Sequence, residues 1–141
     1  MGNYKKIYDN WQKYPKKFWK EQSENIDWEK NPVKILDDDN KPFYKWYPDG
    51  SLNTCFNAID RHVINGRGEQ DAILYDSPVT NTKKKITYSE LKYQVSIFAG
   101  ALKKLGVLKG DRVIIYMPMI PEALVAMLAC SRLGAIHSVV F

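Results

Sequence analysis

The sequence predicts an α/β fold that contains a parallel strand–helix–strand unit, preceded by an arm rich in aromatic residues. The first observation is in residues 111–141, where two short, β-branched apolar runs flank a longer apolar run with helix punctuation. A connection of this length makes the two strands parallel, with a right-handed crossover. The second observation is that residues 1–50 hold all four tryptophans of the chain. We therefore expect two regions, residues 1–50 and residues 51–141.

The arm begins with two predicted helices. Apolar side chains recur at helical spacing near its start, at Tyr4, Ile7, Tyr8 and Trp11. Pro15 suits the first position of a second, short helix. Residues 25–42 are polar and rich in turn residues, which predicts irregular structure, and residues 43–47 predict a short strand before the turn at 48–50. Because this arm is too small to hold its own core, we expect it to wrap a larger body.

The next segment predicts a helix and a hairpin. Asn53 or Thr54 caps the helix, which ends at Asn65-Gly66. Residues 71–75 and 84–87 read as two strands of an antiparallel hairpin, joined by a long polar loop over residues 76–82.

A second helix follows directly. Thr87 and Glu90 have the spacing of a capping box, in which each side chain bonds the other residue's backbone N–H. An apolar stripe then runs along one face, at Leu91, Val95, Phe98, Leu102 and Leu105, and Gly106 ends the helix.

Residues 111–117 predict a buried strand, and Pro121 suits the start of the next helix. That helix is apolar nearly all round, so we expect it to be buried. Gly134 suits a left-handed C-cap before the last strand, residues 135–141. Since a parallel sheet needs cover on both faces, we expect residues 51–141 to be the truncated first part of a larger domain.

Composition excludes several classes. A hydrophobic content of 45% is that of a globular chain, and a net charge of +5 is too mild to suggest nucleic acid. No apolar run is long enough to span a membrane. Cys55 and Cys130 lie far apart on apolar helix faces, which indicates buried free thiols. With no signal or transit pattern at the N-terminus, we expect a cytoplasmic protein.

No catalytic or metal-binding residue emerges from the motifs. Gly66-Arg67-Gly68 lacks the spacing of a dinucleotide fingerprint, and no phosphate-binding P-loop motif is present. His62 and His137 are read as structural, and Asp37–Asp39 lacks the glycine and distal glutamate of a calcium loop. Lys83-Lys84-Lys85 is read as a solvated hairpin rather than as a phosphate or RNA contact.

A family resemblance adds what these arguments do not reach. The chain resembles the short-chain acyl-CoA synthetases, that is, the AMP-forming acetyl- and propionyl-CoA synthetases of the adenylate-forming superfamily. The residues that carry the resemblance are Phe18-Trp19, Lys45-Trp46-Tyr47-Pro48-Asp49-Gly50-Ser51-Leu52-Asn53, Asp60-Arg61-His62, Tyr116-Met117-Pro118-Met119-Ile120-Pro121-Glu122-Ala123 and residues 127–141. Residues 75–80 with 85–88 look more like the propionyl branch than the acetyl branch.

The resemblance implies an incomplete N-terminal part of an adenylate-forming large domain, preceded by the family's cap arm. Such enzymes convert a small carboxylate and ATP to an acyl-adenylate and then transfer the acyl group to CoA, with Mg²⁺ neutralising the phosphates. The family's phosphate loop, adenine motifs and catalytic lysine have no counterpart here, so the chain alone is expected to be inactive and to bind none of these cofactors.

By the same resemblance Phe141 is the one cofactor-binding candidate, because the family places this phenylalanine close to the CoA nucleotide. Two other readings stay open. The chain could be a non-catalytic α/β interaction module that pairs through its exposed last strand, or its lysine-rich face could bind nucleic acid. We expect neither nucleic-acid nor membrane partners, and the sequence does not indicate an oligomeric state.

Overall fold

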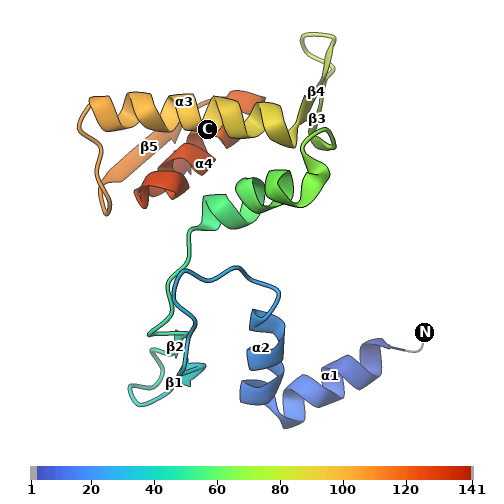
Figure 1. Cartoon of the computed structure of the whole chain (residues 1–141), viewed down its shortest axis with the longest axis vertical. Helices are drawn as coiled ribbons and strands as arrows, with labels where there is room; N and C mark the ends of the chain where they lie inside the picture. The colour runs from blue at the N-terminus through green and yellow to red at the C-terminus, as the bar shows by residue number, and fades with distance from the viewer. Residues whose placement is uncertain (1–2, 141) are drawn as a thin grey trace. The chain divides into compact units, whose positions relative to one another are not determined.

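The computed structural model describes residues 3–140. Figure 1 shows the elements in chain order. The chain divides into two compact units, Met1–Leu52 and Asn53–Phe141, and each unit is described on its own below.

The first unit starts with helices α1 (Tyr4–Lys13) and α2 (Pro15–Ser23), as predicted, with Pro15 at the first position of α2. Strand β2 (Lys45–Trp46) pairs antiparallel with β1 (Leu36–Asp37). The strand predicted over residues 43–47 is therefore too long, and the prediction of irregular structure over residues 25–42 missed β1. A two-residue strand has no alternation for a pattern to detect.

Ring contacts join the parts of this unit. The rings of Trp28 and Tyr47 lie 5.3 Å apart, and those of Trp19 and Trp46 lie 5.9 Å apart. The Tyr47 hydroxyl donates to the carbonyl of Trp19 at 2.8 Å. Position 50 requires glycine because the backbone lies against the Trp28 ring, and a Cβ atom there would be 2.9 Å from that ring. Among residues 3–52 only Ser23 is buried, so aromatic contacts hold this unit together without a closed core.

The second unit opens with a helical segment that contains two π-helical turns, η1 (Phe56–Asp60) and η2 (Val63–Arg67). Asn53 caps it, since the Asn53 carboxamide oxygen accepts from the N–H of Phe56 at 3.0 Å. Asn65 and Gly66 leave the helical conformation, with φ +79° at Gly66, which confirms the predicted end. The π-helical turns were not predicted.

The hairpin of strands β3 (Asp71–Ser77) and β4 (Thr82–Thr87) is antiparallel, as predicted, but longer. The loop predicted over residues 76–82 is wrong, because Asp76 and Ser77 belong to β3, Thr82 belongs to β4, and the turn is shorter. Asp76 faces Lys83 across the hairpin, with a 3.1 Å ion pair between the side chains. The residues of both strands near the turn face water and are polar. They therefore lack the apolar alternation that predicts a strand, and their sequence resembles that of a loop.

Helix α3 (Tyr88–Lys104) has the predicted capping box. The Thr87 hydroxyl accepts from the N–H of Glu90 at 3.2 Å, and the Glu90 carboxylate accepts from the N–H of Thr87 at 2.8 Å. Leu91 and Val95 are buried as predicted. Leu105 is 83% exposed, so its place in the core stripe was wrong, because the helix ends one residue before it.

Strands β5 (Arg112–Tyr116) and β6 (Ile136–Val140) are parallel and are joined by helix α4 (Pro121–Leu133), which confirms the predicted unit. Gly134 has φ +72° and ends α4 in the left-handed conformation, as predicted. The burial of α4 is less complete than predicted, since Leu124 is 37% exposed.

One face of this small sheet is packed and the other is not. Ile115 lies in a core cluster with Ala126 and Cys130 of α4, against which Phe98 and Leu102 of α3 also pack. Val113, His137 and Val139 share the inward side, while the outward residues of both strands are exposed. Helices α3 and α4 (Figure 1) therefore both cover the inner face.

Candidate functional site

In open α/β sheets, ligands bind at the carboxyl ends of the parallel strands. In this chain that edge is formed by Tyr116 of β5 and Val140 of β6, which pair directly in the register. Met117 and Pro118 follow the first strand. Phe141 follows the second, but it lies outside the described residues.

A groove of about 600 Å³ lies beside this edge. Its walls come from β3, from the loop and first turns that begin α4, and from Val139 of β6. Asp76 is its one charged residue, and the Asp76 carboxylate is already paired with Lys83. An apolar lining of this kind suits an apolar ligand or an apolar protein segment. The residues that line the groove include no Lys or Arg that could bind a phosphate.

A buried ion pair holds the start of the second unit. The Arg132 guanidinium donates to both carboxylate oxygens of Asp60, at 2.7 and 3.3 Å, and Asp60 is only 7% exposed. The Lys92 ammonium lies 3.8 Å from the same carboxylate. Asn53 donates through its carboxamide to the carbonyl of Arg132 at 3.1 Å. This network ties η1 to α3 and α4, so its role is structural.

The two histidines lie apart. His62 Nδ1 is 3.1 Å from an Nη of Arg67, and its ring lies 5.0 Å from the ring of Tyr88. Arg67 also lies over the Tyr88 ring at 5.4 Å. His137 sits on the inner side of β6 opposite Val113. The reading of both histidines as structural stays a prediction.

Cys55 and Cys130 are both buried and unpaired, as predicted. Burial raises the pKa of each thiol above the ordinary range. Since the thiolate is the nucleophilic form, neither cysteine is set up for catalysis.

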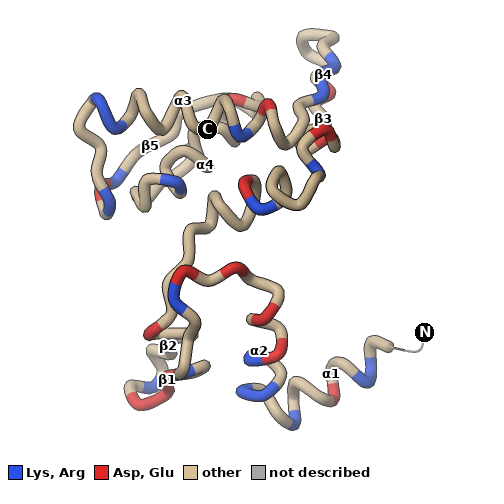
Figure 2. Tube along the Cα trace, viewed as in Figure 1, with Lys and Arg blue, Asp and Glu red and all other residues tan. Residues whose placement is uncertain are grey.

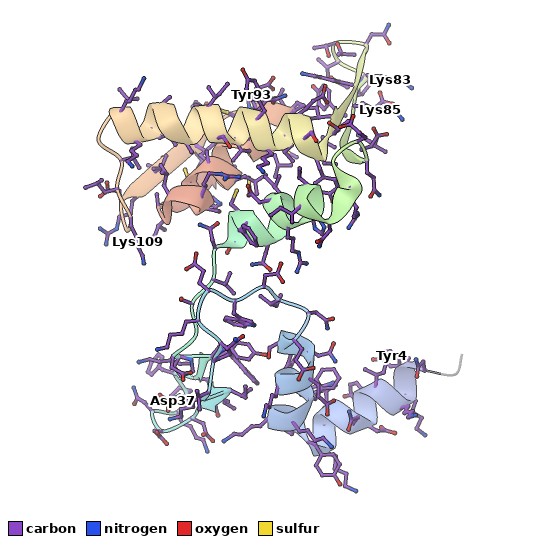
Figure 3. The ribbon with its side chains drawn as sticks, viewed as in Figure 1. Tyr4, Asp37, Lys83, Lys85, Tyr93 and Lys109 are labelled. Atoms are coloured by element: carbon purple, nitrogen blue, oxygen red, sulfur yellow. The ribbon has the colours of Figure 1, made fainter. Side chains whose placement is uncertain are left out.

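The basic triplet is partly neutralised. Figure 3 shows Lys83 and Lys85 on the hairpin. Lys83 pairs with Asp76 at 3.1 Å, and Lys85 pairs with Asp71 at 2.7 Å. Figure 2 shows both cationic and anionic residues along the trace of each unit.

Gly68 and the acidic residues near Lys34 make contacts within the chain. A Cβ atom at Gly68 would lie 2.5 Å from the Ser89 hydroxyl, so this glycine serves close packing at the start of α3 rather than a phosphate cradle. Lys34 bridges Asp37 and Asp39 at 2.9 and 3.1 Å. The hydrogen bond from the Lys34 ammonium lowers the pKa of the Asp37 carboxyl. Within residues 3–140 there is no group of three metal-binding side chains.

No helix in the described part of the chain is both long and apolar enough to cross a bilayer.

Comparison with known proteins identifies the family. The family model of AMP-binding enzymes matches residues 61–141, which is more than half of the chain. The chain belongs to the AMP-binding enzyme family. A second model, the acetyl-coenzyme A synthetase N-terminus, matches residues 4–58. The resemblance to short-chain acyl-CoA synthetases is thereby confirmed.

Relatives within the AMP-binding family agree with this placement. A mitochondrial acyl-CoA synthetase short-chain family member 3 from Bos taurus is 57% identical over 127 residues, covering 90% of this chain and 18% of the relative. An acetyl-coenzyme A synthetase from Streptomyces coelicolor is 52% identical over 124 residues, covering 88% and 19%. Among solved structures, an acetoacetyl-CoA synthetase from Streptomyces lividans matches with TM-score 0.86 and 30% identity, over 99% of this chain and 22% of that one.

The chain spans about 18% of the length of the bovine relative. The expectation of a cytoplasmic location was wrong, because the bovine and human relatives, at 57% and 54% identity, are mitochondrial enzymes. The composition of the first residues was too indirect a guide to where such an enzyme resides.

Proposed function

We propose that this chain is the N-terminal part of an AMP-forming short-chain acyl-CoA synthetase. The complete enzyme converts propionate or acetate and ATP to an acyl-adenylate with release of pyrophosphate. It then passes the acyl group to the CoA thiol as AMP leaves. The observation that carries the proposal is 57% identity to a short-chain acyl-CoA synthetase over nine-tenths of the chain, together with the parallel unit of β5, α4 and β6.

Within that enzyme, residues 1–50 serve as the cap arm and residues 51–141 as the first part of the AMP-binding domain. ATP, CoA and Mg²⁺ are held mainly by the part of the enzyme that this chain does not span, and within residues 3–140 no group of three or more His, Cys, Asp or Glu side chains could hold a metal ion. Phe141 lies close to the CoA nucleotide. No nucleic acid and no membrane takes part.

The experiment is a chimera in which residues 1–141 replace the aligned segment of the bovine relative. We expect propionate-dependent exchange of pyrophosphate into ATP by the chimera and none by the 141-residue chain alone. Turnover by the chain alone, or a folded chimera without exchange, contradicts the proposal. In the active chimera, Phe141→Ala should raise the KM for CoA and leave adenylate formation unchanged, whereas Tyr93→Ala, at an exposed position on α3, should change neither.

The interaction-module reading makes a different prediction. It requires the chimera to be inactive, because a non-catalytic module could not replace the aligned segment of an acyl-CoA synthetase. The exchange assay therefore separates the two readings.

A further inference from the structure

Helix α3 has a second apolar face, which the described part of its unit leaves uncovered. The inner side of the helix packs into the core clusters through Leu91, Val95 and Phe98. On the other side Tyr93 and Ile97 are 68% and 56% exposed, and Figure 3 shows Tyr93 on the side of α3 that faces away from α4. Large apolar side chains one turn apart on a water-facing helix are typical of an interface.

The residues on this face follow a seven-residue repeat. Glu90, Ile97 and Lys104 are seven positions apart, and Tyr93 and Gly100 fall between them at alternating steps of three and four. All five residues are exposed. This is the spacing of the a and d positions of a coiled coil, where one stripe of a helix lies against a second helix. We name these five residues the outer seam.

Neither the space around Gly100 nor its backbone conformation requires a glycine. A Cβ atom added there would meet no other atom within 4 Å, and Gly100 is not among the glycines with positive φ. Glycine inside a helix is also less favourable than alanine. A glycine does serve a close approach from outside, because the missing side chain leaves a depression next to Ile97 into which a second surface can fit.

The outer seam is complementary to a second copy of itself. In an antiparallel pair with a two-fold axis at Ile97, positions equally far from 97 on its two sides face each other. Glu90 and Lys104 are each seven positions away, so each carboxylate meets the ammonium of the other copy. Tyr93 faces the small residue Ala101, beside the glycine of the seam. The two-fold arrangement therefore joins opposite charges at both ends of an apolar centre.

The charges at the two ends also select the orientation. Among the described residues Lys104 makes no ion pair within the chain, and one oxygen of the Glu90 carboxylate accepts from the N–H of Thr87. Both groups can therefore pair with a second copy. A parallel pair would place like charges together at each end, which is unfavourable, so the antiparallel pair is the arrangement that fits.

We propose that two copies of this chain associate through the outer seam of α3, antiparallel and with Ile97 on the two-fold axis. The contact extends over about four helical turns. It therefore belongs to the small, weak interfaces whose occupancy depends on the protein concentration. The proposal concerns association and is independent of the reaction proposed above.

Sedimentation equilibrium of the 141-residue chain over a concentration series tests the pairing. The average mass should rise from 16.3 kDa towards about twice that value. Ile97→Lys places two cations together on the axis and should weaken association roughly tenfold or more. The matched control is Val79→Lys in the hairpin turn, where Val79 is 93% exposed, and it should leave association unchanged. A mass that stays at 16.3 kDa at every concentration overturns the proposal.

Two neighbouring lysines separate a contact at the seam from an effect of net charge. Lys103→Glu and Lys104→Glu make the same change in the last turn of α3, but only Lys104 belongs to the seam. Lys104→Glu should weaken pairing several-fold, because it brings two carboxylates together, and Lys103→Glu should have a smaller effect. Equal effects of the two substitutions contradict the register.

Gly100→Gln tests the close approach while sparing the fold. Glutamine is a better helix former than glycine, and nothing in the chain occupies the space beside Gly100, so this variant should melt at a higher temperature than the parent. It should also pair more weakly, because the new side chain fills the depression. Pairing as strong as in the parent contradicts a close approach at this glycine.

Cysteine cross-linking tests the two-fold axis. The native thiols are buried, so Ile97→Cys provides one reactive thiol per copy, and oxidised glutathione should link two copies through it. Tyr93→Cys alone should not cross-link, because the two copies of position 93 lie about 12 Å apart along the helix, beyond the reach of a disulfide. Tyr93→Cys combined with Ala101→Cys should cross-link. Linkage through Tyr93→Cys alone and not through Ile97→Cys overturns the register.

Other occupants of the seam give different results. If residues 1–50 of the same chain cover it, Ile97→Lys changes the tryptophan fluorescence without changing the mass, because all four tryptophans lie there. If the remainder of the synthetase covers it, Ile97→Lys leaves the mass of the chimera with the bovine relative unchanged. Either result contradicts the proposal, as does association of the chain that survives Ile97→Lys. We expect the Ile97→Lys chimera to keep pyrophosphate exchange and to lose pairing.

Discussion

Asn in place of Asp60 removes one charge from the buried ion pair and leaves the Arg132 guanidinium without its counter-ion. The Asp60 side chain is 10% exposed and the Arg132 side chain is 25% exposed. Breaking a buried pair by removing one partner costs about 3–5 kcal/mol. Because a quarter of Arg132 still reaches water, we take the lower end, about 3 kcal/mol. For a unit of this size each kcal/mol lowers the melting temperature by about 4–8 °C, which gives a fall of about 12–24 °C.

Circular dichroism during heating and urea unfolding measures this loss. The matched control is Asp71→Asn, the same substitution in the ion pair of Asp71 with Lys85, whose side chains are 34% and 73% exposed. Exposed pairs contribute at most about 1 kcal/mol, so this variant should melt close to the parent. If Asp60→Asn and Asp71→Asn lose the same small amount of stability, the Asp60–Arg132 pair is not desolvated and the reasoning fails.

Three further predictions concern single positions. Thr87→Ala removes the cap of α3, and we expect a loss of about 1 kcal/mol in urea unfolding, whereas Thr80→Ala in the hairpin turn should change little. Gly134→Ala forces a side chain into a residue with φ +72°, with its Cβ 3.0 Å from the Lys109 side chain; we expect a loss of about 1–2 kcal/mol, and full stability would contradict the left-handed cap. Burial raises the pKa of the Cys55 thiol above 9.0. The folded state therefore keeps a proton that the unfolded state releases, so stability is full below pH 9.0 and falls above it. Unfolding measured across this range should show a smaller decline in Cys55→Ala than in the parent.

The elements that the sequence predicted well are those with a strong periodic or capping signal. The capping box at Thr87 and Glu90, the left-handed glycine at 134 and the parallel pairing of β5 with β6 all depend on interactions within a few residues or on a crossover of fixed handedness. The two caps are local patterns, and the crossover rule needs only the order and length of the elements, so both can be read without knowing the rest of the fold.

The parts that were missed depend on which partner a residue meets in the fold, and a pattern in its own segment does not show that partner. Strand β1 exists because Leu36 meets Trp46, and the ends of the hairpin exist because Asp76 meets Lys83. The Asp60–Arg132 pair joins residues 72 positions apart. Both residues belong to segments that carry the family resemblance, but no local pattern pairs them. The candidate site was the hardest part to predict from the sequence. Its one proposed residue, Phe141, was suggested by the family resemblance, and no local sequence pattern indicates it.

All four tryptophans of the chain lie in residues 1–50, and the rings of Trp19, Trp28 and Trp46 are joined through aromatic contacts within the first unit. The second unit has none. Tryptophan fluorescence therefore reports on the arm alone. Far-ultraviolet circular dichroism, which includes the helices of the second unit, can be recorded on the same sample. Loosening of the arm and melting of the sheet unit are then separable in one unlabelled sample.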